Sequence, residues 1–157
     1  MTYPILFLDF DGVINSDEGE IEWLKGDFFG FFQPHLVDRV NKITQAVPNC
    51  KLVISSTWRL GTDIDELADI CLRLGLTAEV IGKTCSFGKY SVRGNEIYAY
   101  LKDNAEELGH DYRAYVILDD DCDMLYPQRH NFVRVNGMKG IQESDVDKAI
   151  AIFLENL

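Results

Sequence analysis

The chain has 157 residues, of which 26 are acidic and 15 are basic, giving a formal net charge of −11 at pH 7. This acidity argues against a protein that binds nucleic acid or an anionic membrane on its own, because such binding needs excess positive charge. The hydrophobic fraction of 46% argues against wholesale disorder, and the length is that of one domain.

The first half of the chain predicts two strand–helix units. Short apolar runs rich in Val, Ile and aromatic residues, typical of strands buried on both faces, span residues 5–8 and 52–54. Apolar residues recur every three or four positions over residues 36–47 and 64–74, which predicts a helix after each strand. Asp63 precedes the second helix as an N-terminal cap, and Gly75 follows it as a C-terminal cap.

The second half continues the alternation of strands and helices. Further apolar runs span residues 78–81, 115–118 and 132–135, and helical spacing covers residues 97–108 and 146–154. Gly109 is expected to end the first of these helices, and Ser144 with Asp147 to cap the last. The alternation predicts an α/β fold of three layers, a Rossmann-like five-stranded parallel sheet with helices on both faces.

The segment from residue 15 to residue 33 shows neither period and is expected to form a short flap. It is too short for a separate cap domain, so we expect one domain over residues 1–157. Its run of four phenylalanines has three interpretations: packing at the edge of the core, stacking on a base or sugar, or a self-association patch. These residues are Phe28, Phe29, Phe31 and Phe32.

Acidic residues gather after two of the predicted strands. Asp9 and Asp11 follow the first, and a second group follows residues 115–118: Asp119, Asp120, Asp121 and Asp123. Ligands of an open parallel sheet bind at the carboxyl ends of its strands. Carboxylates held close together need a cation, and oxygen ligands without His or Cys favour Mg²⁺ shared with substrate phosphate. The sequence therefore predicts a Mg²⁺ site at this edge.

Four motifs in order resemble those of the haloacid dehalogenase (HAD) superfamily of phosphohydrolases. Residues 8–14, Leu-Asp-Phe-Asp-Gly-Val-Ile, resemble the first motif, and Ser55 after its strand resembles the second. Arg93 at the start of a helix resembles the third, and residues 117–123 resemble the acidic fourth. The resemblance spans nearly the whole chain. It implies the strand order 5-4-1-2-3, with the first strand central.

The resemblance also implies an activity, Mg²⁺-dependent hydrolysis of phosphomonoesters through an aspartyl-phosphate. Asp9 would be the nucleophile and Asp11 the general acid and base, which favours phosphate chemistry over cleavage of a carbon–halogen bond. Ser55 would bind the transferring phosphoryl group, and Arg93 would steady its charge in preference to Lys89, the competing candidate.

The Mg²⁺ ligands implied by the resemblance are Asp9, the main-chain carbonyl of Asp11, and Asp120. Asp119 or Asp123 would support them. Asp121 is interpreted as a charge at the start of a helix.

The residues 55–59, Ser-Ser-Thr-Trp-Arg, with Arg93-Gly-x-Glu-Ile further on, look more specifically like the HAD domains of "Swiss Army knife" RNA-repair proteins. Arg59 could then contact a substrate phosphate, with Ser56 and Lys89 as further substrate-binding candidates. The alternative for Arg59 is packing beside an aromatic neighbour.

The expected partner is a phosphorylated substrate, either a small molecule or a nucleic-acid end. Two alternatives remain for the function: a polynucleotide 3′- or 5′-phosphatase in nucleic-acid repair, and a non-catalytic HAD-like binding module.

Four widely spaced cysteines form no Cys-x-x-Cys pair: Cys50, Cys71, Cys85 and Cys122. This spacing argues against a zinc ribbon, a redox motif and a disulfide scaffold. The N-terminal apolar run is interrupted by Asp9 and lacks a basic leader, so it does not resemble a signal peptide. We expect a soluble, cytoplasmic protein with no membrane partner.

Overall fold

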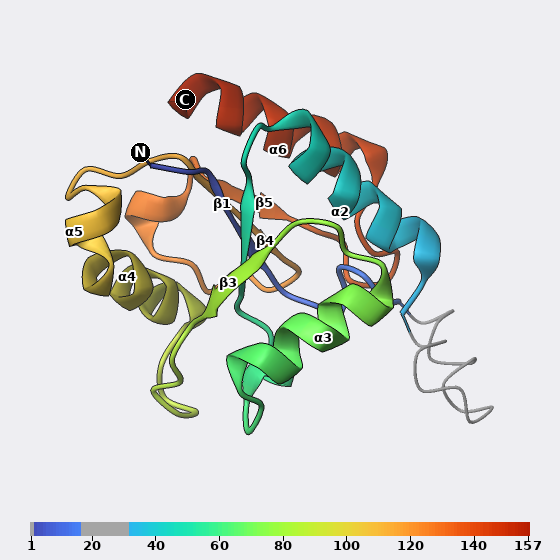
Figure 1. Cartoon of the computed structure of the whole chain (residues 1–157), viewed down its shortest axis with the longest axis horizontal. Helices are drawn as coiled ribbons and strands as arrows, with labels where there is room; N and C mark the ends of the chain where they lie inside the picture. The colour runs from blue at the N-terminus through green and yellow to red at the C-terminus, as the bar shows by residue number, and fades with distance from the viewer. Residues whose placement is uncertain (1, 17–31) are drawn as a thin grey trace.

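One five-stranded sheet organises the part of the chain that the computed structural model describes, residues 2–16 and 32–157 (Figure 1). The strands are β1 (Ile5–Leu8), β2 (Lys51–Ile54), β3 (Val80–Lys83), β4 (Tyr115–Asp119) and β5 (Phe132–Arg134). They pair in parallel in the order β3-β2-β1-β4-β5, which is the predicted order read from the other edge. The predicted fold class is confirmed, with β1 in the centre.

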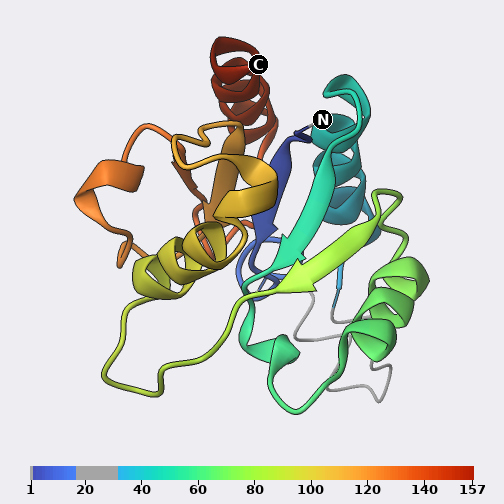
Figure 2. The ribbon, with the colours of Figure 1, turned by 60° about the vertical axis from the view of Figure 1, so that its left-hand side comes forward.

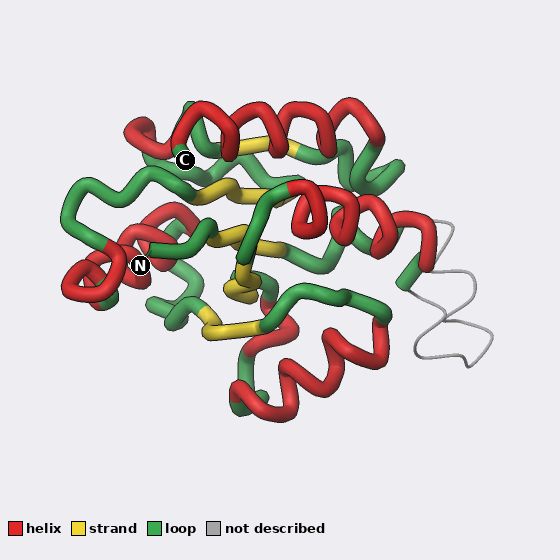
Figure 3. Tube along the Cα trace, turned by 45° about the horizontal axis from the view of Figure 1, so that its top comes forward, coloured by secondary structure: helices red, strands yellow, loops and turns green. Residues whose placement is uncertain are grey.

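Helices cover both faces of the sheet (Figure 2). One face carries α2 (Pro34–Ala46), α3 (Ile64–Leu74) and α6 (Glu143–Asn156), and the other carries α4 (Arg93–Asp103) and α5 (Ala105–Leu108). Two single-turn 3₁₀ helices, η2 (Thr57–Arg59) and η3 (Tyr126–Gln128), lie in loops. Figure 3 shows the strands side by side between the helices.

The central strand divides the core in two because its side chains alternate between the faces of the sheet. Leu6 and Leu8 pack with the face that carries α2, α3 and α6. Ile5 and Phe7 pack with the face that carries α4 and α5. All four side chains are fully buried, as the continuous apolar run predicts for a strand covered on both sides.

Several predicted boundaries were wrong by a few residues. The third strand lies at Val80–Lys83, two residues later than predicted. The predicted helix over residues 97–108 is two helices, α4 and α5, which meet at Asn104. The last helix begins at Glu143, and its cap is the Asp145 carboxylate accepting from the Gln142 N–H at 2.8 Å, not Ser144 with Asp147. A local sequence pattern does not fix which of several neighbouring polar residues closes a helix.

Between β2 and α4, where every residue is described, the chain holds no cap domain. Residues 55–93 form η2, α3, β3 and a loop, with no further domain. The predicted flap lies largely outside the described residues, as do Phe28, Phe29 and Phe31. Phe32 pairs with Asn15 in an isolated antiparallel bridge and is buried in the core.

The two ends of the described chain lie close together at the amino edge of the sheet (Figures 1 and 2). Thr2, before β1, and Leu157, after α6, line one cavity. The carboxyl ends of the strands point toward the opposite edge of the molecule. Within the described ranges, no helix combines the length and the hydrophobicity that crossing a bilayer requires.

Candidate active site

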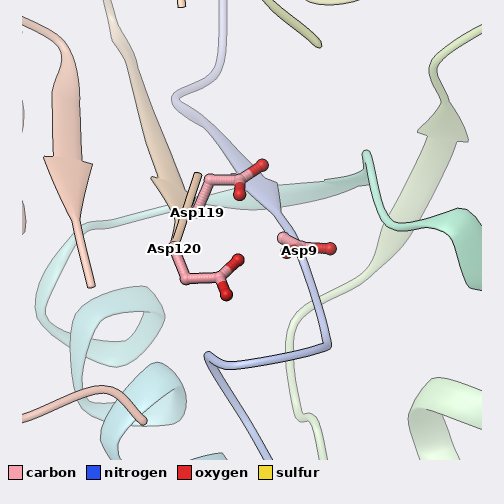
Figure 4. Close-up of side chains that lie close together, drawn as sticks. All are labelled: Asp9, Asp119 and Asp120. Carbon is pink, nitrogen blue, oxygen red and sulfur yellow. The ribbon is translucent and has the colours of Figure 1, made fainter. Parts of the chain in front are cut away.

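The carboxyl ends of β1 and β4 bring three carboxylates together (Figure 4). The two strands pair with Leu8 opposite Leu118, so the residues that follow leave the sheet at the same level. One carboxylate oxygen from each of Asp9, Asp119 and Asp120 lies within 4.8 Å of the others. Three of the four residues predicted to hold a metal therefore place their carboxylates together, and the fourth, Asp11, was predicted to contribute its main-chain carbonyl.

Burial makes this cluster electrostatically costly. Asp9 is 6% exposed and Asp119 is 1% exposed. Burial, followed by the nearby Asp119 carboxylate, raises the pKa of Asp9, while Arg93 opposes the shift. Burial also raises the pKa of Asp119, against a hydrogen bond from the Asp121 N–H. A divalent cation among these oxygens would offset the repulsion.

The residues present fit a hard metal ion such as Mg²⁺. The donors are all carboxylate oxygens, the type that Mg²⁺ prefers. Asp119 Oδ2 is buried without a hydrogen-bond partner, which leaves one ligand atom unsatisfied by the protein. A metal site among Asp9, Asp119 and Asp120 is thus consistent with both the chemistry and the burial.

Two glycines allow the backbone to close around Asp120. A Cβ built on Gly12 would lie 2.4 Å from Asp120 Oδ2, and one built on Gly137 would lie 2.6 Å from the same atom. Gly12 also has a φ of +79°, a conformation that side chains with a Cβ rarely adopt. Any larger residue at either position would displace the Asp120 carboxylate.

The side chain of Asp11 stands apart from the three clustered carboxylates. Its Oδ1 accepts a hydrogen bond from Asn15 Nδ2 at 2.9 Å and another from Trp58 Nε1 at 3.1 Å. Trp58 in turn packs edge to face on Phe32. Asn15 and Trp58 were not predicted to act on Asp11, because neither contact has a signature in the sequence.

Arg93 reaches the cluster and Lys89 does not. Arg93 Nη1 lies 3.8 Å from Asp9 Oδ1. The Asp123 carboxylate accepts from the Arg93 backbone N–H at 2.9 Å, which fixes the start of α4. Lys89 is exposed in the loop between β3 and α4, with its Nζ 5.0 Å from the centre of the Tyr90 ring.

Buried polar atoms without a partner gather at this same edge. Among the described residues, five buried side-chain atoms have no hydrogen-bond partner, and all lie in or beside the loops at the carboxyl ends of the strands. They are Ser55 Oγ, Thr84 Oγ1, Arg93 Nη1, Asp119 Oδ2 and Asp123 Oδ1. Such atoms are rare in folded proteins, and their gathering at one edge of the sheet is typical of a binding or catalytic site. Ser55 Oγ and Arg93 Nη1 are suitable donors to a phosphate.

Arg59 differs from the sequence-based prediction. Its guanidinium is buried and makes five hydrogen bonds, which equals the number of N–H donors that an arginine has. The acceptors are the carbonyls of Ser55, Ser56, Thr84 and Cys85 and the carboxylate of Glu96. Arg59 therefore has no donor left for a substrate phosphate, and its contribution is to the fold.

Ser56 is also inward-facing. It is fully buried, and its hydroxyl accepts from the Trp58 N–H at 3.3 Å as the cap of η2. The predicted contact of the Ser56 side chain with substrate is not supported by this placement. Asp121 is exposed and starts no helix, because the chain continues through a loop to η3.

Glu96, which the sequence placed in a motif without a role of its own, joins Arg59 to Arg93. It is buried, pairs with Arg59 at 3.1 Å, and has its Oε1 3.9 Å from Arg93 Nε. Its other oxygen accepts from the Phe87 N–H at 3.1 Å. An acid three residues after Arg93 on a helix was the available signal, since such residues share one face.

Comparison with known families gives one match. A family model for the HAD domain in Swiss Army Knife RNA repair proteins matches residues 5–146. That span contains the whole sheet and each of the clustered carboxylates. Comparisons with curated proteins and with solved structures gave no match.

Proposed function

Because the chain belongs to the family of HAD domains found in Swiss Army Knife RNA repair proteins, we propose that it is a Mg²⁺-dependent hydrolase of phosphomonoesters. The observation that carries the proposal is the position of Asp9. Its carboxylate lies among the oxygens of Asp119 and Asp120 and beside Arg93. Two donors at this edge, Ser55 Oγ and Arg93 Nη1, have no hydrogen-bond partner.

In the first step, a carboxylate oxygen of Asp9 attacks the phosphorus of the substrate. The ester P–O bond breaks, and the leaving oxygen takes a proton from Asp11. Arg93 Nη1 and Ser55 Oγ donate hydrogen bonds to the phosphoryl oxygens as charge builds on them. Mg²⁺, held by Asp9, Asp119 and Asp120 and by the predicted carbonyl of Asp11, would supply further neutralisation of that charge.

In the second step, water hydrolyses the aspartyl-phosphate. Asp11, now a carboxylate, accepts a proton from the attacking water, and the bond between phosphorus and the Asp9 oxygen breaks. Inorganic phosphate leaves, and both aspartates return to their starting states. The two hydrogen bonds to Asp11 keep its carboxylate in one orientation through both steps.

The test is the Asp9→Asn variant with 4-nitrophenyl phosphate in Mg²⁺. We expect activity to fall by at least about 10³-fold, because the amide cannot act as the nucleophile. The control is Asp38→Asn, which removes an equal charge from an exposed position on α2 and should keep full activity. Circular dichroism checks the fold of both. A fully active Asp9→Asn protein would rule out this mechanism.

A second candidate is the hydrolysis of a terminal phosphate on a nucleic acid, and the RNA-repair description of the matching family favours it. A panel of 3′- and 5′-phosphorylated oligonucleotides, compared with small phosphomonoesters, tests it. A wild-type protein inactive on the whole panel in Mg²⁺ would favour the remaining alternative, a non-catalytic binding module.

We assign the protein to the cytoplasm, with support from its four free cysteines.

A further inference from the structure

A cavity opens beside the three carboxylates, at the carboxyl end of β5. It has a volume of about 360 Å³ and is lined by Asp120, Arg134, Val135, Asn136 and Gly137. A volume of this size falls within the range of small-molecule sites. Asp120 belongs both to this cavity and to the carboxylate cluster, so the two adjoin.

The guanidinium of Arg134 makes one hydrogen bond to the protein, and its other donors have no partner among the described residues. Arg134 is the last residue of β5 and pairs with Asp119 in the sheet. Its Nε–H donates to the main-chain carbonyl of Asp120 at 3.3 Å. Among the described residues, Nη1 and Nη2 have no hydrogen-bond or ion-pair partner. The guanidinium of Arg59, in contrast, is fully used by the protein.

Asn136 adds a second donor to the same cavity. Its Oδ1 accepts from the Met138 N–H at 3.1 Å, an arrangement that uses the oxygen of the amide. The Nδ2 group of Asn136 has no partner within the described residues. The cavity thus offers unpaired hydrogen-bond donors from Arg134 and Asn136. Its one carboxylate, Asp120, belongs to the metal cluster. Because the free groups are donors and one of them is positively charged, they suit an anionic ligand.

We propose that this cavity is a subsite for a second phosphate group of the substrate, on the leaving-group side of the scissile phosphate. Arg134 would bind it through both Nη atoms, the geometry that guanidinium and phosphate favour, and Asn136 would donate a further hydrogen bond. The inference rests on the proposed function. It names the substrate class as organic phosphates with a second phosphate next to the one removed.

The second phosphate has two chemical sources, a phosphodiester next to a nucleic-acid end or a second monoester on a small molecule. Three probes separate them: thymidine 3′-monophosphate, thymidine 3′,5′-bisphosphate, and a thymidine dinucleotide with a 3′-phosphate. Binding is measured by calorimetry to Asp9→Asn protein in Mg²⁺, which binds without turnover, and hydrolysis is measured with the wild type.

The variant is Arg134→Gln, made in both backgrounds. We expect it to weaken binding of the two doubly phosphorylated probes about tenfold, as loss of a charge-assisted contact does, and binding of the monophosphate less than about twofold. If only the dinucleotide binds more tightly than the monophosphate to the protein that keeps Arg134, the second group is a phosphodiester. If the bisphosphate gains as much affinity over the monophosphate, the class extends to small molecules.

The matched control is Arg129→Gln, which removes the same charge from another exposed arginine, stacked on Tyr126 3.9 Å from the ring centre. Equal losses with all three probes, or equal losses in the two variants, would overturn the subsite. If the wild type hydrolyses the monophosphate as well as the doubly phosphorylated probes, the proposed function stands and the subsite is overturned. If the protein binds the doubly phosphorylated probes more tightly but hydrolyses none of the three, the subsite stands and the proposed function is overturned.

Discussion

At the scale of single residues, hydrogen bonds orient the side chain of Asp11, the proposed general acid. Its donors come from two segments, Asn15 four positions along the chain and Trp58 on η2. Both contacts are made to one oxygen, Oδ1, and the structure shows no side-chain donor to the other oxygen among the described residues. That second oxygen is available to exchange a proton with the substrate or with water.

This arrangement predicts an effect of Trp58→Phe that depends on the leaving group. The phenyl ring keeps contact with Phe32 but cannot donate to Asp11. We expect kcat to fall about tenfold for an alkyl phosphate, whose leaving oxygen needs a proton. With 4-nitrophenyl phosphate, a leaving group that departs without a proton, we expect little change in the first step, measured as the burst of 4-nitrophenolate, because only hydrolysis of the aspartyl-phosphate then needs Asp11. Equal losses in the first step for both substrates would mean that Trp58 acts through packing alone.

The four thiols are predicted to fall into two classes of reactivity. Burial raises the pKa of Cys50 to about 12, and that of Cys71 to about 12 as well. Cys85 and Cys122 are exposed. Because the thiolate is the reactive form, a disulfide reagent at pH 8 should modify two thiols quickly in the native protein and all four in denaturant. Rapid modification of more than two in the folded state would contradict the burial.

At the scale of elements, Arg59 joins three segments that carry site residues. Arg59 is the last residue of η2. Its side chain donates hydrogen bonds to main-chain carbonyls that follow β2 and β3, and it pairs with Glu96 on α4. Glu96 in turn lies beside Arg93, the cation next to Asp9. Arg93 therefore lies next to the buried ion pair of Arg59 and Glu96, and Glu96 is the residue that links the two arginines.

Replacing Arg59 should lower the stability of the protein far more than replacing an exposed arginine. We expect Arg59→Gln to lower the free energy of unfolding by about 3–5 kcal/mol, because it leaves Glu96 buried without its partner. The control is Arg73→Gln, which breaks an exposed pair with Asp69 on α3 and should cost about 0.5 kcal/mol or less. Urea denaturation measures both, and similar losses would contradict the structural role given to Arg59.

The elements also show what the sequence could and could not predict. The strands and the clustered carboxylates were predictable because both depend on local features, apolar runs and the residues that follow them. The role of Arg59 was not, because its acceptors at Thr84 and Cys85 lie some 25 residues away and are main-chain carbonyls. Every residue has such a carbonyl, so the sequence carries no mark of the contact.

At the scale of the whole molecule, part of the acidity is a property of the site. Three of the 26 acidic residues meet at one point, two of them buried. Their mutual repulsion opposes folding when no metal is bound. The stability of the protein should therefore respond to divalent cations.

We expect Mg²⁺ at about one hundred times its Kd to raise the free energy of unfolding by about 2.7 kcal/mol, and Tm by roughly 5–10 °C. Asp120→Asn should stabilise the metal-free protein, since it removes one like charge, and should reduce the shift caused by Mg²⁺. Thermal melts with KCl at matched ionic strength provide the control. An equal shift in KCl would exclude a specific site.

The closeness of Thr2 and Leu157 at the amino edge has a practical consequence for protein engineering. A short linker between them should permit circular permutation, with new ends opened in a surface loop away from the carboxylates. A tag or fused domain at either present end would extend from the edge opposite Asp9. Neither extension would therefore lie next to the carboxylate cluster.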